Sequence, residues 1–253
     1  MHLMNFPVIV FILSFLGLWA SARLGSILQK RRPAMSEAEQ ADLGVIVAAA
    51  LTLLGLIIGF TFSMAITRYD QRKNYEEEEA NAIGTEYLRI DLLGSPVGPA
   101  LQQKLREYVD LRITYYQDRD PSNRRQLDAE EARLQAEMWR GVESLGRANP
   151  NPVGALAVSG MNDVLNTQGY TQAAWWNRIP VAAWALMFAI AIACNILIGY
   201  SAHQVAGRAS RHVVFPLIVS IAFLLIADID SPRGGIIRVH PQNLEALAKS
   251  LHP

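Results

Sequence analysis

The chain has 253 residues, of which 51% are hydrophobic and 18% charged, and its formal net charge is zero. This hydrophobic content is high for a soluble protein, and no basic stretch interleaved with aromatic residues supports nucleic-acid binding. The charges concentrate in residues 68–178, which hold 14 of the 23 basic and 17 of the 23 acidic residues. The single cysteine, Cys194, excludes an intrachain disulfide.

Four stretches without charged residues predict transmembrane helices, at about residues 6–22, 43–67, 179–202 and 212–227. The second and third exceed the roughly 30 Å thickness of the hydrocarbon core at about 1.5 Å per residue. For the first, a cleaved signal peptide is the alternative, but no basic segment precedes it, which favours a retained helix. The fourth is short, and a re-entrant segment is its alternative; we favour a span, with Pro216 in its first turn.

Small or weakly polar residues recur on one face of the second span, and we call them the small-residue stripe: Thr52, Gly55, Gly59, Ser63 and Thr67. They predict either the wall of a water-filled pore or close packing against another helix. Bulky Ile58, Phe62 and Ile66 lie beside the stripe. They predict either a hydrophobic constriction that gates by dewetting or packing against lipid or core.

The segment after the second span is polar and helical. No proline interrupts residues 43–93, which predicts one helix of about 51 residues. Further apolar faces with a period of 3.6 follow, separated by turns at residues 94–99, 118–122 and 146–152. The apolar positions are Ala80, Ile83, Gly84, Tyr87 and Leu88; Leu101, Leu105, Tyr108, Val109 and Ile113; and Leu127, Leu134, Met138, Val142 and Leu145.

Charged clusters follow the second and fourth spans. Arg68, Asp70 and Arg72 are either interfacial anchors or a charged ring at a pore mouth. Residues 76–79 are four glutamates about 100° apart around a helix, for which we expect a solvated face; a ring of glutamates that attracts cations in an oligomer is the alternative. Beyond the fourth span, acidic residues and paired glycines predict a tight turn that holds either a carboxylate–arginine pair or a cation. The candidate residues of that turn are Asp228, Asp230 and Arg233.

The predicted fold class is an all-α integral membrane protein with four transmembrane helices and a helical extramembrane domain between spans two and three. Residues 1–67 and 178–228 are predicted transmembrane hairpins, residues 68–177 the extramembrane domain, and residues 229–253 a C-terminal turn and short helix. Basic residues flank the spans equally on both sides, so orientation stays open. No catalytic residue, cofactor site or metal site is predicted, and an enzyme is not expected.

Three blocks together resemble the bacterial bestrophin-like family: residues 55–65 with 68–72, residues 79–85 including Glu79 and Asn81, and residues 228–235. The resemblance implies a multi-pass protein of the bacterial cytoplasmic (inner) membrane that forms a homo-oligomer, pentameric as in true bestrophins. It also implies an ion channel for small inorganic ions, with the second span lining the pore. The alternative is a non-conducting membrane scaffold or signalling module whose helical domain docks a partner.

Overall fold

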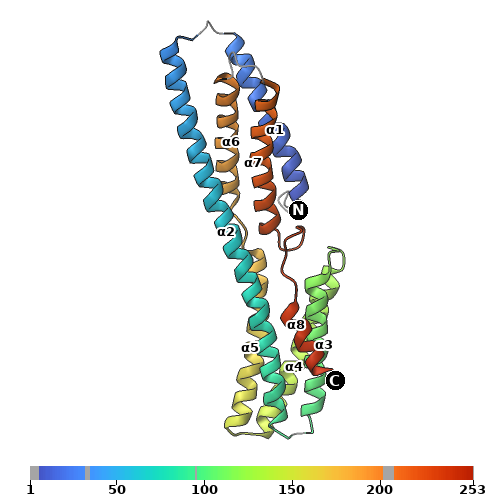
Figure 1. Ribbon diagram of the computed structural model, residues 1–253. Helices are drawn as coiled ribbons and strands as arrows, with labels where there is room; N and C mark the ends of the chain where they lie inside the picture. Colours follow the sequence, from blue (N-terminus) through green and yellow to red (C-terminus); the bar gives the residue numbers. More distant parts are fainter. Residues whose placement is uncertain (1–5, 32–34, 95, 202–207, 253) are drawn as a thin grey trace. The chain divides into compact units, whose positions relative to one another are not determined.

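The computed structural model of the protein is all-helical (Figure 1). It describes residues 6–31, 35–94, 96–201 and 208–252, so residue 202, the end of the predicted third span, lies outside. Within these ranges the regular elements are the helices α1 (Pro7–Lys30), α2 (Glu37–Asp91), α3 (Gly98–Gln117), α4 (Arg124–Ala148), α5 (Pro152–Trp176), α6 (Val181–Ser201), α7 (Arg208–Asp230) and α8 (Gln242–Leu251).

The helix α2 is unbroken over 55 residues, which confirms the long helix predicted across residues 43–93. A capping box starts it. The backbone N–H of Ser36 donates to the Glu39 carboxylate at 2.8 Å, and the backbone N–H of Glu39 donates to the Ser36 hydroxyl at 3.3 Å. The chain forms two compact units, and α2 contributes to both: the first unit is Met1–Tyr69 with Arg178–Arg238, and the second is Asp70–Asn177 with Val239–Pro253.

The first unit is built from α1, α6, α7 and the first part of α2. Four helical segments of the described chain are long and apolar enough to cross a membrane: Pro7–Lys30, Glu37–Asp91, Pro152–Ser201 and His212–Asp230. Buried apolar side chains form the core of the first unit, among them Leu18, Leu54, Trp184, Met187 and Phe223. Asn195 is buried in this unit as well, and its amide donates to the carbonyl of Ala191 in its own helix at 2.8 Å.

Glycines bring α1 and α6 into backbone contact. A Cβ atom at Gly25 would lie 2.1 Å from the carbonyl oxygen of Ile196, and one at Gly199 would lie 2.0 Å from that of Ala22. The Ser26 hydroxyl lies at the same crossing, 3.0 Å from the carbonyl oxygen of Gly199, to which it donates. Close packing through small residues is a usual way to join helices in a membrane, where apolar burial gives little driving force.

The position predicted for Pro216 is wrong. The helix α7 begins at Arg208, so Pro216 lies in its interior rather than in its first turn. The Arg-Ala-Ser-Arg segment before the uncharged stretch extends the helix, because Arg and Ala have high helix propensity. Pro216 therefore removes one backbone hydrogen bond within the helix.

The second unit combines α3, α4, α5 and α8 with the second part of α2. The apolar faces predicted for α3 and α4 are buried, including Leu105, Tyr108, Met138 and Val142. Leu88 of α2 was predicted on a buried face, but its side chain is 66% exposed.

The helix α5 was not predicted as a separate element. Its start carries a recognisable signal: Asn151 accepts from the backbone N–H of Gly154 at 2.9 Å, with Pro152 in the first turn.

We predict that Gly199→Leu lowers the free energy of unfolding by about 2 kcal/mol or more, because the new side chain has to displace the backbone of α1. Denaturant unfolding of the detergent-solubilised protein measures the change. Gly17→Leu is the matched control, since a Cβ atom at Gly17 meets no described atom within 4 Å. An equal loss of stability in both variants would contradict the role of the α1–α6 crossing.

Candidate functional site

The small-residue stripe lies on an open face of α2. Thr52, Gly55, Gly59 and Ser63 are exposed. A Cβ atom at either glycine would meet no described atom within 4 Å. Close packing of this stripe against another helix of the same unit, the alternative to a pore wall, is therefore not found among the described residues.

The two threonines of the stripe turn their hydroxyls to the helix itself. The Thr52 hydroxyl donates to the carbonyl of Ala48 at 2.9 Å, and the Thr67 hydroxyl donates to that of Ser63 at 3.0 Å. Such bonds to the preceding turn keep a hydroxyl satisfied in an apolar medium. The stripe thus presents small, weakly polar groups rather than free donors.

The bulky residues beside the stripe occupy different environments. Ile58 and Phe62 are half-buried and pack against the core of the first unit. Ile66 is 38% exposed. Of the three, Ile66 therefore has the largest exposed fraction.

Charged residues after the second span are divided between the two units. In the first unit, the Arg68 guanidinium lies 3.7 Å from the Asp230 carboxylate. Asp230 also accepts from the backbone N–H of Ile179 at 3.2 Å. In the second unit, Asp70 is exposed and Arg72 is buried. The cluster is therefore divided between exposed and buried positions of the protomer.

A tight turn follows α7, and Asp228 organises it. Its two carboxylate oxygens accept from the backbone N–H groups of Ile236 and Ile237, at 2.8 and 2.7 Å. A Cβ atom at Gly235 would lie 2.4 Å from the carbonyl oxygen of Asp228, so the turn needs glycine there. Arg233 lies half-buried within the turn.

No metal centre forms from the described residues. They contain no group of three or more His, Cys, Asp and Glu side chains placed to hold a metal ion. In the C-terminal turn, both carboxylates accept hydrogen bonds from the backbone. The N–H groups of Ile236 and Ile237 donate to Asp228, and the N–H group of Ile179 donates to Asp230. These bonds give the carboxylates a structural role in holding the chain.

The expectation of a solvated face at residues 76–79 is wrong for two of the four glutamates. Glu77 and Glu78 are exposed, but Glu76 and Glu79 are buried. Glu76 caps α8: its carboxylate accepts from the backbone N–H groups of Asn243 and Leu244, both at 2.9 Å. Burial raises the pKa of Glu76, and these N–H donors oppose the rise. The helix α8 is thereby tied to α2 through a side chain far away in sequence.

Glu79 belongs to a buried ion-pair network. Arg112 of α3 donates to both oxygens of Glu79, with one N–O distance of 3.2 Å, and to Glu131 of α4 at 2.5 Å. The hydroxyl of Thr171 in α5 donates to Glu79 at 3.2 Å. Burial raises the pKa of Glu131, and Arg112 opposes the rise. The network therefore joins four helices of the second unit, whereas Asn81 is exposed on α2.

Sequence reasoning missed Arg112 and Glu131, although helical spacing carried a signal. Arg112 stands four positions after Tyr108, and Glu131 stands three positions before Leu134, so each lies on a predicted apolar face. Two opposite charges on the buried faces of successive helices indicate an internal ion pair, since isolated charges are rarely buried.

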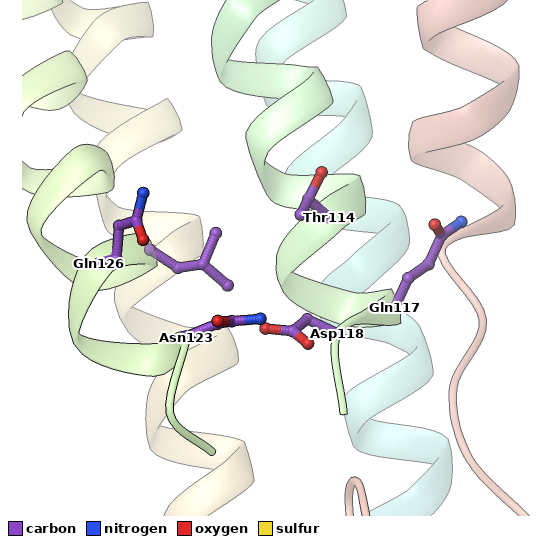
Figure 2. A pocket seen from close by; sticks show the side chains of 6 residues that line it. Thr114, Gln117, Asp118, Asn123 and Gln126 are labelled. Atoms are coloured by element: carbon purple, nitrogen blue, oxygen red, sulfur yellow. The ribbon is translucent and has the colours of Figure 1, made fainter. Parts of the chain in front are cut away.

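A hollow of about 520 Å³ lies where α3 ends and α4 begins. Figure 2 shows the side chains of Asn123 and Asp118 pointing toward one another there. The other lining residues are Thr114, Gln117, Gln126 and Leu127. This lining of amides with a single carboxylate contains no acid–base or nucleophile pair.

Comparisons with known proteins identify the family and the fold. A family model described as "Bestrophin-like domain" matches residues 10–244. Crystal structures of variants of a bacterial bestrophin homolog from Klebsiella pneumoniae share the fold. One has a TM-score of 0.64 at 13% identity over 95% of this chain and 93% of that one. Another has a TM-score of 0.65 at 12% identity over 96% and 97%. No curated protein sequence matches the chain significantly.

We predict that Arg112→Met lowers the free energy of unfolding of the second unit by about 3 to 5 kcal/mol, because it leaves Glu79 and Glu131 buried without their cation. Thermal unfolding measures the loss. Arg133→Met is the control: Arg133 pairs with Glu130 and Glu137 on the surface, and its removal should leave stability nearly unchanged. Similar losses in the two variants would show that the buried network has no special role.

We also predict that Glu76→Ala frays α8, because the N–H groups of Asn243 and Leu244 lose their acceptor. Loss of a helix cap costs about 1 kcal/mol, which corresponds to a roughly fivefold faster amide exchange in α8. Hydrogen exchange read by mass spectrometry over residues 242–251 measures it. Glu77→Ala, a change at an exposed neighbour, should leave this exchange unaltered; equal effects would argue against the cap.

Proposed function

We propose, from the premise that this chain belongs to the Bestrophin-like family, that it assembles as a homo-oligomer and conducts small inorganic ions through a pore lined by α2. The family resemblance favours a pentamer in the bacterial cytoplasmic membrane. The bilayer-spanning segments are then α1, the apolar part of α2, α6 and α7. The division is that expected from the sequence: hairpins at residues 1–67 and 178–228, and the helical domain 68–177 outside the membrane.

The open small-residue stripe of α2 carries this proposal. In the apolar segment of α2, 6% of the residues are buried, against 50% for that of α7. An outer face that meets only lipid has no need of small residues, whereas Gly55, Gly59 and Ser63 allow close approach of another chain or leave room for water and ions. A second copy of the chain, arranged around a shared axis, meets this requirement.

Other candidate residues take different parts in the proposal. Ile66 has the largest exposed fraction of the three bulky residues beside the stripe and is assigned to the constriction, together with the half-buried Ile58 and Phe62. Asp70 and Asn81 are exposed on α2 and are the candidates for the pore mouth. The buried residues Arg72 and Glu79, and the turn residues Asp228, Asp230 and Arg233, are assigned to holding the protomer together.

The alternative of a scaffold that docks a partner has weaker support. That function would favour a cluster of exposed apolar side chains on α3 and α4. Among the described residues of these two helices, Trp139 is the one large apolar side chain that is exposed, with an exposed fraction of 38%. One such residue does not make a docking face.

We predict that Ser63→Trp blocks ion flux, because an indole on the open face of α2 would fill a pore that the stripe lines. The measurement is flux from liposomes that contain the purified protein, in chloride and in potassium salts, with an expected fall of about tenfold or more. Met64→Trp is the matched control, since Met64 is exposed but points about 100° away around the helix.

Equal flux in wild type and Ser63→Trp would overturn the assignment of α2 as the pore wall. Absence of flux from folded, inserted wild-type protein in every salt would overturn the channel itself and favour the scaffold. Phe62→Ala is a poor probe of the constriction, because Phe62 packs against the core and its truncation costs about 3 kcal/mol of stability.

A further inference from the structure

The carboxyl group of Glu86 is buried in the second unit without a hydrogen-bond partner. Its side chain lies on the inner face of α2 and is fully buried. Neither carboxylate oxygen has a hydrogen-bond partner among the described residues. An ionised carboxylate in such a place is costly, and a buried acid of this kind instead tends to hold its proton.

Gly160 of α5 provides the space that the Glu86 carboxyl fills. A Cβ atom at Gly160 would lie 2.0 Å from Oε2 of Glu86 and 2.4 Å from Nη1 of Arg89. The two side chains of α2 therefore converge on the backbone of α5 at one point. Any charge that develops on Glu86 arises inside the α2–α5 contact.

Two charged groups act on Glu86. Arg89, one turn further along α2, favours the ionised carboxylate, and Asp163 of α5 favours the protonated acid. The Arg89 guanidinium lies 4.0 Å from the Asp163 carboxylate, so it forms an ion pair between the two helices. Arg89 therefore lies close to both acids. When both are charged, the two carboxylates compete for its single guanidinium group.

We propose that Glu86 is a proton-controlled switch of the α2–α5 contact. When Glu86 is protonated, Arg89 pairs with Asp163 and joins the two helices. When Glu86 ionises, it draws Arg89 into a pair within α2, three residues apart, and α5 loses its ion pair. The new buried charge lies against the backbone of Gly160, and α5 moves away from α2.

The titration of Glu86 places this change in the alkaline range. Burial raises the pKa of Glu86 to about 8, although Arg89 opposes the rise. Because the folded state holds this proton more tightly than the unfolded chain, Glu86 stabilises the fold most at acidic pH. This contribution falls as the pH rises from the ordinary carboxyl pKa to about 8, and is level above it. The switch does not depend on ion conduction, so its failure and the failure of the proposed channel are separate results.

The first test is an infrared pH titration of the full chain in lipid nanodiscs. In wild type, we expect a protonated-carboxyl band that disappears with a midpoint near pH 8. Glu86→Gln should lack this band, and Glu77→Gln, at an exposed neighbour, should retain it. A band unchanged by Glu86→Gln, or a wild type without such a band at pH 7, overturns the proposal.

The second test measures the helix contact itself. Spin labels at the exposed positions 85 of α2 and 162 of α5, in a Cys194→Ala background, report the distance between the helices. We expect the distance distribution to lengthen or broaden between pH 6 and pH 9.5 in wild type and to stay constant in Glu86→Gln. A distribution in wild type that is identical at both pH values overturns the switch.

A further variant keeps the proposal testable if Glu86→Gln does not fold. Asp163→Asn removes the charge that favours the protonated acid and frees Arg89 for Glu86. The infrared midpoint should then fall below that of wild type. A midpoint that stays in place or rises contradicts the competition for Arg89.

Discussion

The need to neutralise buried carboxylates governs the architecture of the second unit. Three glutamates on the inner face of α2 meet this need in different ways. Glu76 accepts from the first N–H groups of α8, Glu79 pairs with Arg112, and Glu86 lies unpaired against Gly160. Each solution recruits a different helix, because an uncompensated charge inside a protein costs more than a single helix contact contributes. The buried carboxylates therefore connect α2 to α8, α3 and α5.

Glycine serves two opposite purposes in the first unit. At Gly25 and Gly199 the missing side chain is covered at once by a carbonyl group of the neighbouring helix. At Gly55 and Gly59 it remains uncovered within the described chain. The first pair joins α1 to α6 inside one protomer, and the second leaves a smooth face on the least buried apolar helix. This contrast, rather than the presence of glycine itself, supports the proposal that α2 faces other copies of the chain.

Much of the fold could be predicted because local rules govern it. The uncharged stretches, the lack of proline across residues 43–93 and the turn residues between the polar helices all act within a few positions of themselves. Two of the errors occurred where a distant contact overrode the local pattern. Glu76 and Glu79 read as solvated because their partners, Asn243 and Arg112, lie far away in sequence. Leu88 read as buried, although no neighbouring element of its unit covers it.

The sequence by itself determined the all-helical class, the four apolar segments and the long α2, because periodicity and hydropathy are properties of the chain alone. It also identified the family, through the resemblance of its three sequence blocks. Only the tertiary structure decided which small residues are covered, which glutamates are buried and which groups surround each of them. Those outcomes depend on the distance between residues of separate helices, and neither hydrophobic periodicity nor turn chemistry sets that distance. The closed Gly25–Gly199 crossing and the open stripe on α2 contain the same kinds of residue, and packing alone makes them different.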